Sequence, residues 1–501
     1  MAGSACQPRP VPKTWTQAVT IRPFLPSALA VLLLTACGGG DSGGPVEVVA
    51  IGPQPKLAAS DGDAASTPSA ILDLSVAQGL VAFDASGQVE PGLAERWIVS
   101  DDGLSYIFRL RDTEWRPGRP IKAAELARLL RRKLSPNAGH RLARSFHAVD
   151  AVIAVTDDIL EIRLKQPRPQ FLALLAQPEL TLHSAMRGGG PFRMAEQQGT
   201  AFLLAPITDP ESPATAQARY PVRLRAGRAA VAVVRYDRGQ ADLVLGGGYA
   251  DLPYARVINP PGAQLRFDPV PGLFGLGVVN QEGFLATAEN REAVSMAIDR
   301  QAIVRAFDIP GWNPVNAIVP ARLDLAAEPA QPEWLPVDRE QRVAIARARV
   351  AAWRGNNAAF PRLRIALPAG AGSRILFARL AIDLGQIGII AERVAFDAAA
   401  DLRLIDEVAP HDSATWYLTR LSCARRLPCG ETGDAALTAS RDAPSLAERS
   451  VKLSQADSAY AVNVPFIPIA SPVRWSLVRS RLQGFKPNAR AVHPLNHLLK
   501  D

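Results

Sequence analysis

The feature that most constrains this chain is an apolar run near its start, from Phe24 to Leu34. Three basic residues, Arg9, Lys13 and Arg22, precede the run, and the small residues Gly38–Gly40 follow it. A run of about 11 apolar residues between such flanks is typical of an export signal, and it is too short to span a bilayer as a helix. The alternative is a buried core strand. The order of basic, apolar and small residues favours export, so the rest of the chain is expected to fold after leaving the cytoplasm.

The end of the apolar run, Leu34-Thr35-Ala36-Cys37, resembles a bacterial lipoprotein signal. The resemblance implies that residues 1–36 are a signal peptide and that the thiol of Cys37 is lipidated. Residues 37–45 are rich in Gly and Ser and predict a flexible tether. The expected location is extracytoplasmic, in the periplasm or cell envelope, with a lipid anchor in a membrane. Gly38 after the cysteine resembles outer-membrane sorting signals.

Removal of residues 1–36 leaves 465 residues, more than one hydrophobic core normally organises, so two or more domains are expected. A content of 48% hydrophobic and 21% charged residues is typical of a globular protein. The formal net charge of +8 falls to +5 without the signal, and the arginines do not interleave with aromatic residues. This pattern argues against a nucleic-acid partner. The densest basic run, residues 131–144, is interpreted as a solvated helix face.

Only two cysteines, Cys423 and Cys429, remain in the predicted folded body. Two cysteines six positions apart in an oxidising compartment predict a local disulfide. The alternative is a metal site, which needs more ligands than two thiols, and His411 is the nearest histidine. We therefore expect no metal.

Helix and strand patterns alternate along the whole chain, which favours an α/β architecture. Asp299 is placed to cap a helix that continues the helical run beginning at Thr287. Asp157-Asp158 is expected to turn a hairpin. The expected strands include Val46–Ile51, Leu104–Leu110, Ile153–Val155, Ile159–Leu164, Val231–Arg235, Ala241–Leu245, Arg362–Leu367, Pro465–Ile469 and Val473–Val478. The expected helices are Ala70–Leu80, Ala123–Lys133, Thr287–Phe307, Arg339–Trp353, Arg374–Ile387 and Ser445–Val462.

Signatures of catalysis and of cofactor binding are weak in this sequence. The six histidines are dispersed, and no His-Glu-x-x-His occurs. His493 and His497 are four residues apart, and we interpret them as a surface pair, since two ligands make no zinc site. The runs Gly188–Gly190 and Gly246–Gly248 lack the Lys-Ser/Thr of a phosphate-binding loop. We therefore predict no catalytic residues and no cofactor, and an extracytoplasmic hydrolase is the less favoured alternative.

Several segments resemble, in order, the family 5 solute-binding proteins of bacterial ABC importers, which bind dipeptides and oligopeptides. The strongest match is Pro91-Gly92-Leu93-Ala94-Glu95-Arg96-Trp97 followed by Ser100–Leu110. Trp115-Arg116-Pro117-Gly118-Arg119-Pro120-Ile121 is similar to the Trp-x-Asp-Gly-x-Pro-Val segment of the family. Further matches are Gly189–Phe192, Gly239–Asp242, the helix pair Glu289–Arg300, Pro465–Ile469 and Gly484-Phe485.

The resemblance implies an α/β, two-lobed periplasmic-binding-protein fold (type II, cluster C), with mixed sheets flanked by helices and a small inserted subdomain. Lobe I is expected to comprise residues 46–83, 186–271 and 471–501. The inserted subdomain is expected at 84–185, and lobe II at 272–470. The chain would cross between the lobes near Leu273–Val278 and Pro468–Val473, where a hinge is expected.

The function implied is the substrate-binding component of an ABC importer, which captures a peptide-like or other small solute between its lobes and delivers it to the permease. The expected partners are that solute, ABC permease subunits in the cytoplasmic membrane and a membrane reached through the lipid anchor. No nucleic-acid partner is expected, and the protein is expected to be a monomer. A sensor or structural lipoprotein of the same fold is the alternative.

The resemblance breaks down where the peptide binders carry a Trp-x-x-Asp segment, whose carboxylate pairs with the free amine of the ligand. Here Trp416-Tyr417-Leu418-Thr419 ends in Thr, and spacing does not choose among Asp406, Glu407 and Asp412 as a replacement. Gln78 stands where the family has Glu. The predicted ligand-binding residues are Gln78, Trp416, Tyr417 and Asp412. For Trp416 and Tyr417, packing in the core of lobe II is an equal alternative.

Overall fold

The computed structural model describes residues 44–57, 66–116, 118–184, 189–207, 218–355 and 359–500. The expected signal peptide, Cys37 and the tether as far as residue 43 lie outside the described residues. Within the described ranges, no helix is both long and apolar enough to cross a membrane.

The first large sheet has seven strands in the order β10-β11-β12-β1-β13-β20-β14. β1 is parallel to both β12 and β13, and the other pairings are antiparallel. Its strands are β1 (Val46–Ile51), β10 (Phe192–Gln198), β11 (Ala201–Pro206), β12 (Val222–Gly227), β13 (Leu243–Gly248), β14 (Leu265–Phe267) and β20 (Arg474–Val478). Its helices are α1 (Thr67–Val76), α4 (Ala229–Asp237) and α5 (Leu252–Val257).

The strand expected at Val231–Arg235 is wrong, because this segment lies within helix α4. The buried residues of α4 are Ala229, Ala232, Val233 and Tyr236, which have helical spacing. A short apolar run does not distinguish a strand from a buried helix by itself. Topology decides here, since parallel strands on either side of β1 require a crossover connection between β12 and β13.

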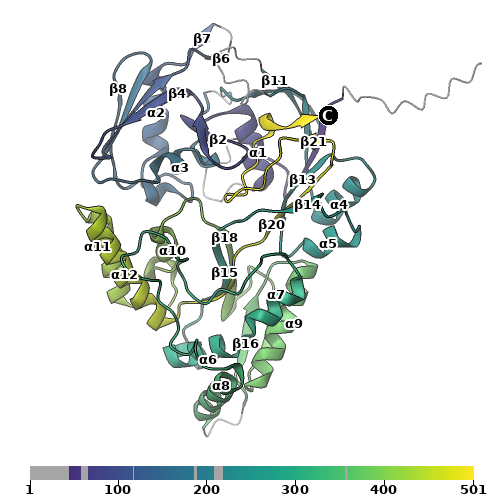
Figure 1. Cartoon of the computed structure of the whole chain (residues 1–501), viewed down its shortest axis with the longest axis vertical. Helices are drawn as coiled ribbons and strands as arrows, with labels where there is room; N and C mark the ends of the chain where they lie inside the picture. The colour runs from purple at the N-terminus through teal and green to yellow at the C-terminus, as the bar shows by residue number, and fades with distance from the viewer. Residues whose placement is uncertain are drawn as a thin grey trace, which may run out of the picture. The chain divides into compact units, whose positions relative to one another are not determined.

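The second large sheet has five strands in the order β17-β16-β18-β15-β19. The predicted helix boundary at Asp299 is confirmed, because its carboxylate accepts a hydrogen bond from the Ala302 amide at 2.9 Å. The strands are β15 (Gly272–Val278), β16 (Arg362–Ala366), β17 (Ile390–Val394), β18 (Leu402–Val408) and β19 (Phe466–Ala470). The helices are α6 (Ala288–Ala297), α7 (Arg300–Phe307), α8 (Arg339–Arg354), α9 (Ala371–Gln386), α10 (Ala414–Arg420), α11 (Glu431–Asp442) and α12 (Leu446–Asn463). Figure 1 shows α11 and α12 side by side, beside α10.

A third sheet of four strands, in the order β4-β5-β9-β8, has its own hydrophobic core, which includes Phe108, Leu126 and Leu160. The predicted hairpin around Asp157-Asp158 is confirmed by the antiparallel pairing of β8 with β9. The strands are β4 (Ala94–Val99), β5 (Ser105–Leu110), β8 (Val149–Ala154) and β9 (Ile159–Leu164), and helix α2 (Ala123–Lys133) packs on them.

Short elements complete the described chain. They are β2 (Val81–Phe83), β3 (Val89–Pro91), β6 (Glu114–Arg116), β7 (Arg119–Pro120), α3 (Phe171–Leu175), β21 (Leu482–Gln483), β22 (Leu499–Lys500) and 3-10 helices at Ala143–Phe146, Pro178–Leu180, Gly283–Ala286, Cys423–Arg425 and Leu495–His497.

The chain passes between the seven-stranded and five-stranded sheets twice. Residues 268–271 connect β14 to β15, and residues 471–473 connect β19 to β20. The second crossing falls within the expected Pro468–Val473. The first precedes the expected Leu273–Val278, because those residues form β15 itself. Two adjacent crossings of this kind are the covalent requirement for a hinge.

Candidate functional site

A cavity of about 640 Å³ is lined by residues from all three sheet regions. Leu245 of β13 and Trp475 of β20 come from the seven-stranded side. Asp406 at the end of β18 and Trp416 of α10 come from the five-stranded side. Residues between Arg141 and Glu179 contribute the third wall, from the region of the four-stranded sheet. Sites for small molecules typically have volumes of ~300–1,000 Å³, so this cavity is large enough for a solute.

A buried polar network fixes the start of α10, which carries Trp416 into the cavity wall. The Asp324 carboxylate accepts hydrogen bonds from the Ser413 hydroxyl at 2.9 Å and the Ala414 amide at 2.6 Å. Arg449 donates to Asp324 at 2.6 Å and to the Thr415 hydroxyl at 2.6 Å. Arg449 is only 6% exposed, so its pairing satisfies a charge that would otherwise be buried alone. The network therefore holds one wall of the cavity in place.

Of the four predicted ligand-binding residues, Trp416 lines the cavity. Its ring meets Tyr417 edge-on, with 4.8 Å between the ring centres. Tyr417 is buried in the core of the five-stranded side, does not line the cavity, and its hydroxyl has no hydrogen-bond partner. Both rings thus pack in the same hydrophobic core, and of the two only Trp416 also lines the cavity.

Gln78 and Asp412 do not line the cavity either. Gln78 forms a backbone bridge with Leu182, and its side-chain oxygen is buried without a hydrogen-bond partner. Asp412 is exposed and accepts a hydrogen bond from Arg490 at 2.7 Å. The structure therefore does not bring the four predicted residues together around one space.

Each of the four carboxylates among the cavity-lining residues has a cationic or imidazole partner. Asp406 pairs with Arg474 at 2.8 Å, Glu407 with Arg420, Asp268 with His493 at 3.1 Å, and Glu179 with Arg141. Burial raises the pKa of Asp406, and the Arg474 cation opposes that rise. With Asp412, which does not line the cavity, Asp406 and Glu407 were the predicted alternatives for recognising a ligand amine. Both are already engaged by arginines.

Nine arginines line the cavity, and four of them have no carboxylate within ion-pair distance among the described residues. These four are Arg144, Arg168, Arg425 and Arg441. Arg168 donates to three neutral acceptors, the Pro167 carbonyl at 3.0 Å, the Arg441 carbonyl at 3.0 Å and the His147 ring at 3.2 Å. Burial lowers the pKa of Arg168 to about 10, and the Arg449 cation adds to that lowering. The cavity wall therefore has an excess of positive charge.

Sequence reasoning missed this arginine set. The run 131–144 was expected to be a solvated helix face, and Arg132 is indeed exposed. The end of the run, however, follows helix α2, and its Arg141 and Arg144 line the cavity. Arg425, Arg441 and Arg449 come from separate elements and form no motif in the sequence, so only the fold brings them together.

Two direct hydrogen bonds join the wall at residues 141–179 to the five-stranded side. The Gln177 side-chain amide donates to the Pro410 carbonyl at 2.8 Å, and Arg168 donates to the Arg441 carbonyl at 3.0 Å. Both join residues more than 200 positions apart in the sequence, and all four residues line the cavity. The structure therefore shows an arrangement in which the two sides touch.

Two histidines in the cavity wall have lowered pKa values. His411 is 6% exposed, and its Nδ1 has no hydrogen-bond partner. Burial lowers the pKa of His411 to about 4, and the Arg490 cation contributes. Burial likewise lowers the pKa of His147, and so do the cations of Arg168 and Arg441.

The expected surface pair of His493 and His497 is wrong, because each side chain is only 9% exposed. His493 pairs with Asp268, whereas His497 pairs with Glu90 at 3.0 Å. The two rings bond to different acids, so they are not arranged as a shared metal site.

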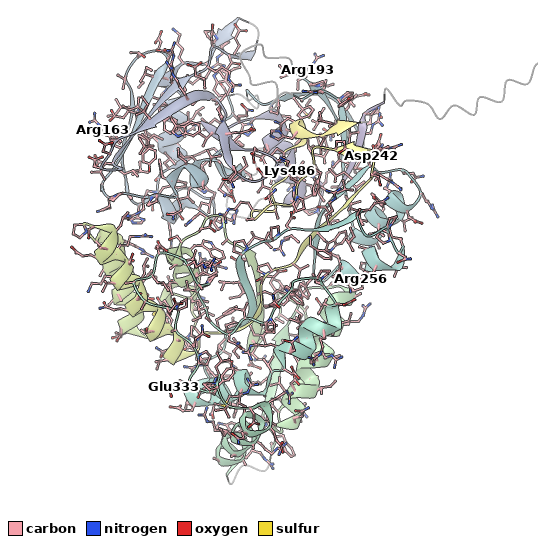
Figure 2. The ribbon with its side chains drawn as sticks, viewed as in Figure 1. Arg163, Arg193, Asp242, Arg256, Glu333 and Lys486 are labelled. Carbon is pink, nitrogen blue, oxygen red and sulfur yellow. A yellow bond between two sulfur atoms is a disulfide. The ribbon has the colours of Figure 1, made fainter. Side chains whose placement is uncertain are left out.

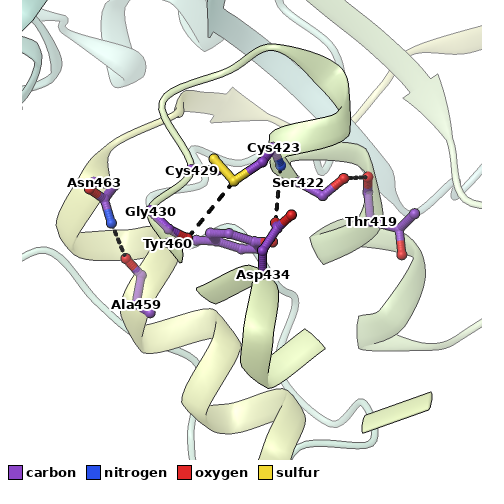
Figure 3. Close-up of a disulfide and its surroundings, with 9 residues drawn as sticks. All are labelled: Thr419, Ser422, Cys423, Cys429, Gly430, Asp434, Ala459, Tyr460 and Asn463. Carbon is purple, nitrogen blue, oxygen red and sulfur yellow. Dashed lines mark hydrogen bonds between the residues drawn. A yellow bond between two sulfur atoms is a disulfide. The ribbon is translucent and has the colours of Figure 1, made fainter. Parts of the chain in front are cut away.

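Cys423 and Cys429 are joined by a disulfide (Figure 3). With Asp434 they form the one group of three possible metal ligands found among the described residues. The bonded sulfurs are not available as thiolates. Asp434 accepts hydrogen bonds from the Cys423 amide at 3.0 Å and from the Tyr460 hydroxyl. This group is therefore a link between α11, α12 and the disulfide loop.

The family-like residue Asp242, labelled in Figure 2, has a structural role. Its carboxylate accepts hydrogen bonds from the Glu47 amide at 2.9 Å and from Arg481 at 2.6 Å. It thereby ties β1 to the segment after β20. The resemblance of the Gly239–Asp242 segment to the family therefore reflects a structural role, because Asp242 does not line the cavity.

Comparison with known protein families gives a match to the model for bacterial extracellular solute-binding proteins, family 5 (middle), over residues 88–354. The chain is 26% identical over 484 residues to the probable di/tripeptide-binding protein 5 of Pseudomonas aeruginosa, covering 82% of this chain and 87% of that protein. It is 37% identical over 128 residues to the probable deoxycholate-binding periplasmic protein YgiS of Escherichia coli. That alignment covers 22% of this chain and 24% of the relative.

Among solved structures, the fold is similar to that of Haemophilus influenzae OppA in complex with RPPGFSPFR, with a TM-score of 0.76 and 16% identity. The superposition covers 91% of this chain and 99% of that chain. The predicted α/β, two-lobed fold is confirmed.

Proposed function

Because the chain belongs to the bacterial extracellular solute-binding proteins of family 5, we propose that it captures a small solute outside the cytoplasm and delivers it to an ABC permease. The family consists of binding proteins, and we propose that this chain binds without catalysing a reaction. The observation that carries the proposal is the cavity of about 640 Å³, whose lining comes from both lobes.

The proposed mechanism is closure of the lobes about the two crossings at residues 268–271 and 471–473. A solute favours the closed state only through contacts that the open state cannot make, such as simultaneous contact with both lobes. A shift from 1% to 99% closed requires about 5.5 kcal/mol of differential binding free energy. The hydrogen bonds of Gln177 and Arg168 to the five-stranded side stabilise this arrangement without a ligand, which reduces the binding free energy that the solute must supply for closure.

The domain limits follow the sheets. We assign residues 46–83, 186–271 and 471–501 to lobe I, 84–185 to the inserted subdomain and 272–470 to lobe II. The seven strands of the first sheet fall in the lobe I ranges, and β15–β19 fall in the lobe II range. The four-stranded sheet falls within the subdomain range.

We further propose that Cys37 carries a lipid that anchors a monomeric protein at a membrane of the cell envelope. The support is the sequence Leu34-Thr35-Ala36-Cys37 after a short apolar run. Trp416 is the predicted ligand contact that the cavity geometry favours. A peptide remains a candidate solute, because one relative is named as a di/tripeptide-binding protein.

Native mass spectrometry of the protein purified from its own host tests the proposal. We expect a retained solute that denaturation releases, and reduced retention in Trp416→Ala. Trp97→Ala is the matched control, because Trp97 lies on β4 and does not line the cavity. A protein that neither carries a solute nor binds any member of a peptide and metabolite panel contradicts capture.

A further inference from the structure

The cavity lining carries more positive than negative charge. Nine arginines and four carboxylates line it, and each carboxylate already has a partner. Of the four arginines without a carboxylate partner, Arg168 and Arg441 are half-buried, whereas Arg144 and Arg425 are exposed. Like charges gathered around one cavity repel one another, so this surplus of arginines favours the binding of an anion.

The surplus arginines come from both sides of the cleft. Arg144 and Arg168 belong to the inserted subdomain, whereas Arg425 and Arg441 belong to lobe II. The positive charges of the two sides act on each other. Burial and the Arg420 cation lower the pKa of Arg425 most, and the Arg144 cation lowers it further. The closed arrangement therefore brings like charges toward each other, and this repulsion opposes closure in the absence of a counter-ion.

The rest of the lining is suited to hydrogen bonding. The His411 side chain is buried, and its Nδ1 has no hydrogen-bond partner among the described residues. Trp416, which lines the same cavity, adds an apolar surface. A guanidinium presents a planar pair of donors that matches the two oxygens of a carboxylate or phosphate.

We propose that the cleft selects an oxyanionic solute, one whose net charge is negative because it carries carboxylate or phosphate groups, and that Arg144, Arg168, Arg425 and Arg441 bind those groups from both lobes. The inference rests on the proposed function and names the chemical class of its solute. The anion replaces repulsion across the cleft with attraction, so that binding and closure are coupled. A ligand recognised mainly through a free amine is disfavoured, because the lining carboxylates are occupied by cations.

Isothermal titration calorimetry on the purified full-length chain tests the inference with probes matched in size and different in charge. The peptide probes are triglutamate, trialanine and trilysine. Citrate, inorganic phosphate and pyrophosphate separate carboxylate from phosphate recognition. We expect saturable binding of at least one oxyanion and a decline in its affinity as sodium chloride rises from 50 to 500 mM, because salt screens the attraction.

Arg168→Gln and the pair Arg144→Gln with Arg425→Gln are expected to weaken binding of the oxyanion about tenfold or more, on the scale of a lost charge-assisted hydrogen bond. Arg193→Gln is the matched control, because Arg193 is exposed on β10 and does not line the cavity. Circular dichroism checks that each variant is folded.

Three outcomes overturn the inference. Binding of trialanine or trilysine in preference to every oxyanion contradicts the proposed charge selection and leaves solute capture standing. Equal oxyanion affinity in the Arg168 and Arg193 variants contradicts the proposed contacts. Absence of saturable binding for every probe, together with no solute retained from the host, overturns the inference and the proposed function together.

Discussion

Asp457 provides a sharp test of the energetics of lobe II. It lies on α12 and is 2% exposed. One carboxylate oxygen accepts a hydrogen bond from the Ala330 amide at 2.8 Å, and the other has no partner. Burial raises the pKa of Asp457 from 3.8 to about 6, against a lowering by that hydrogen bond. The Asp457 carboxyl therefore holds its proton more tightly in the folded state than in the unfolded state.

The consequence is a stability that falls as pH rises. Between pH 4 and 6 the unfolded chain binds fewer protons at this site than the folded protein, so the free energy of unfolding decreases with pH in that window. Raising the pKa of Asp457 by about 2 destabilises the folded protein by about 3 kcal/mol once the carboxyl is ionised. This loss of stability is present in full above the folded-state pKa. Asp457→Asn removes the charge and keeps an acceptor for Ala330. We expect it to raise the free energy of unfolding by up to about 3 kcal/mol at pH 7.5 and by little at pH 4.

Urea denaturation of the wild type and Asp457→Asn at pH 4, 6 and 7.5 measures the difference, and other titrating groups cancel in it. Asp397→Asn is the control, because Asp397 is exposed. A stability difference that does not change with pH, or a variant less stable than the wild type at pH 7.5, refutes the assignment of a buried charge penalty to Asp457.

Two further changes test the packing. Replacing Cys423 and Cys429 with Ser removes a disulfide of sequence separation 6. We expect the free energy of unfolding, measured with denaturant, to fall by about 2 kcal/mol. An unchanged denaturation midpoint contradicts this expectation. Gly247→Ala places a Cβ 2.1 Å from the Trp475 ring, and we expect a loss of about 1–3 kcal/mol. Gly262→Ala, which meets nothing within 4 Å, is the control, and equal thermal midpoints for the two alanine variants speak against the close approach.

Elements set by local patterns were predictable from the sequence. Strand β1 at Val46–Ile51 and helix α2 at Ala123–Lys133 have the predicted boundaries. In both, the apolar spacing matches the period of the element, so local burial and tertiary burial agree. Helix α4 was mistaken for a strand because its apolar run is continuous, and its crossover role appears only in the sheet order.

The cavity was harder to predict than the fold. Trp416 was predicted because it lies in the region that corresponds to the Trp-x-x-Asp segment of the family, and it does line the cavity. The charge of the cavity depends on which arginines remain after ion pairing, and that depends on contacts such as Arg474 with Asp406, 68 residues apart. Sequence spacing carries no information about such pairs. Asp412 was a reasonable candidate from its position in the sequence. In the structure it pairs with Arg490 and does not line the cavity.

Small-angle X-ray scattering of the purified protein, with and without the solute it binds, tests closure of the two lobes most directly. We predict a larger radius of gyration without solute, and at saturation a scattering curve that matches the present arrangement, in which Gln177 contacts Pro410. Saturable binding with an unchanged radius of gyration would contradict capture by hinge closure.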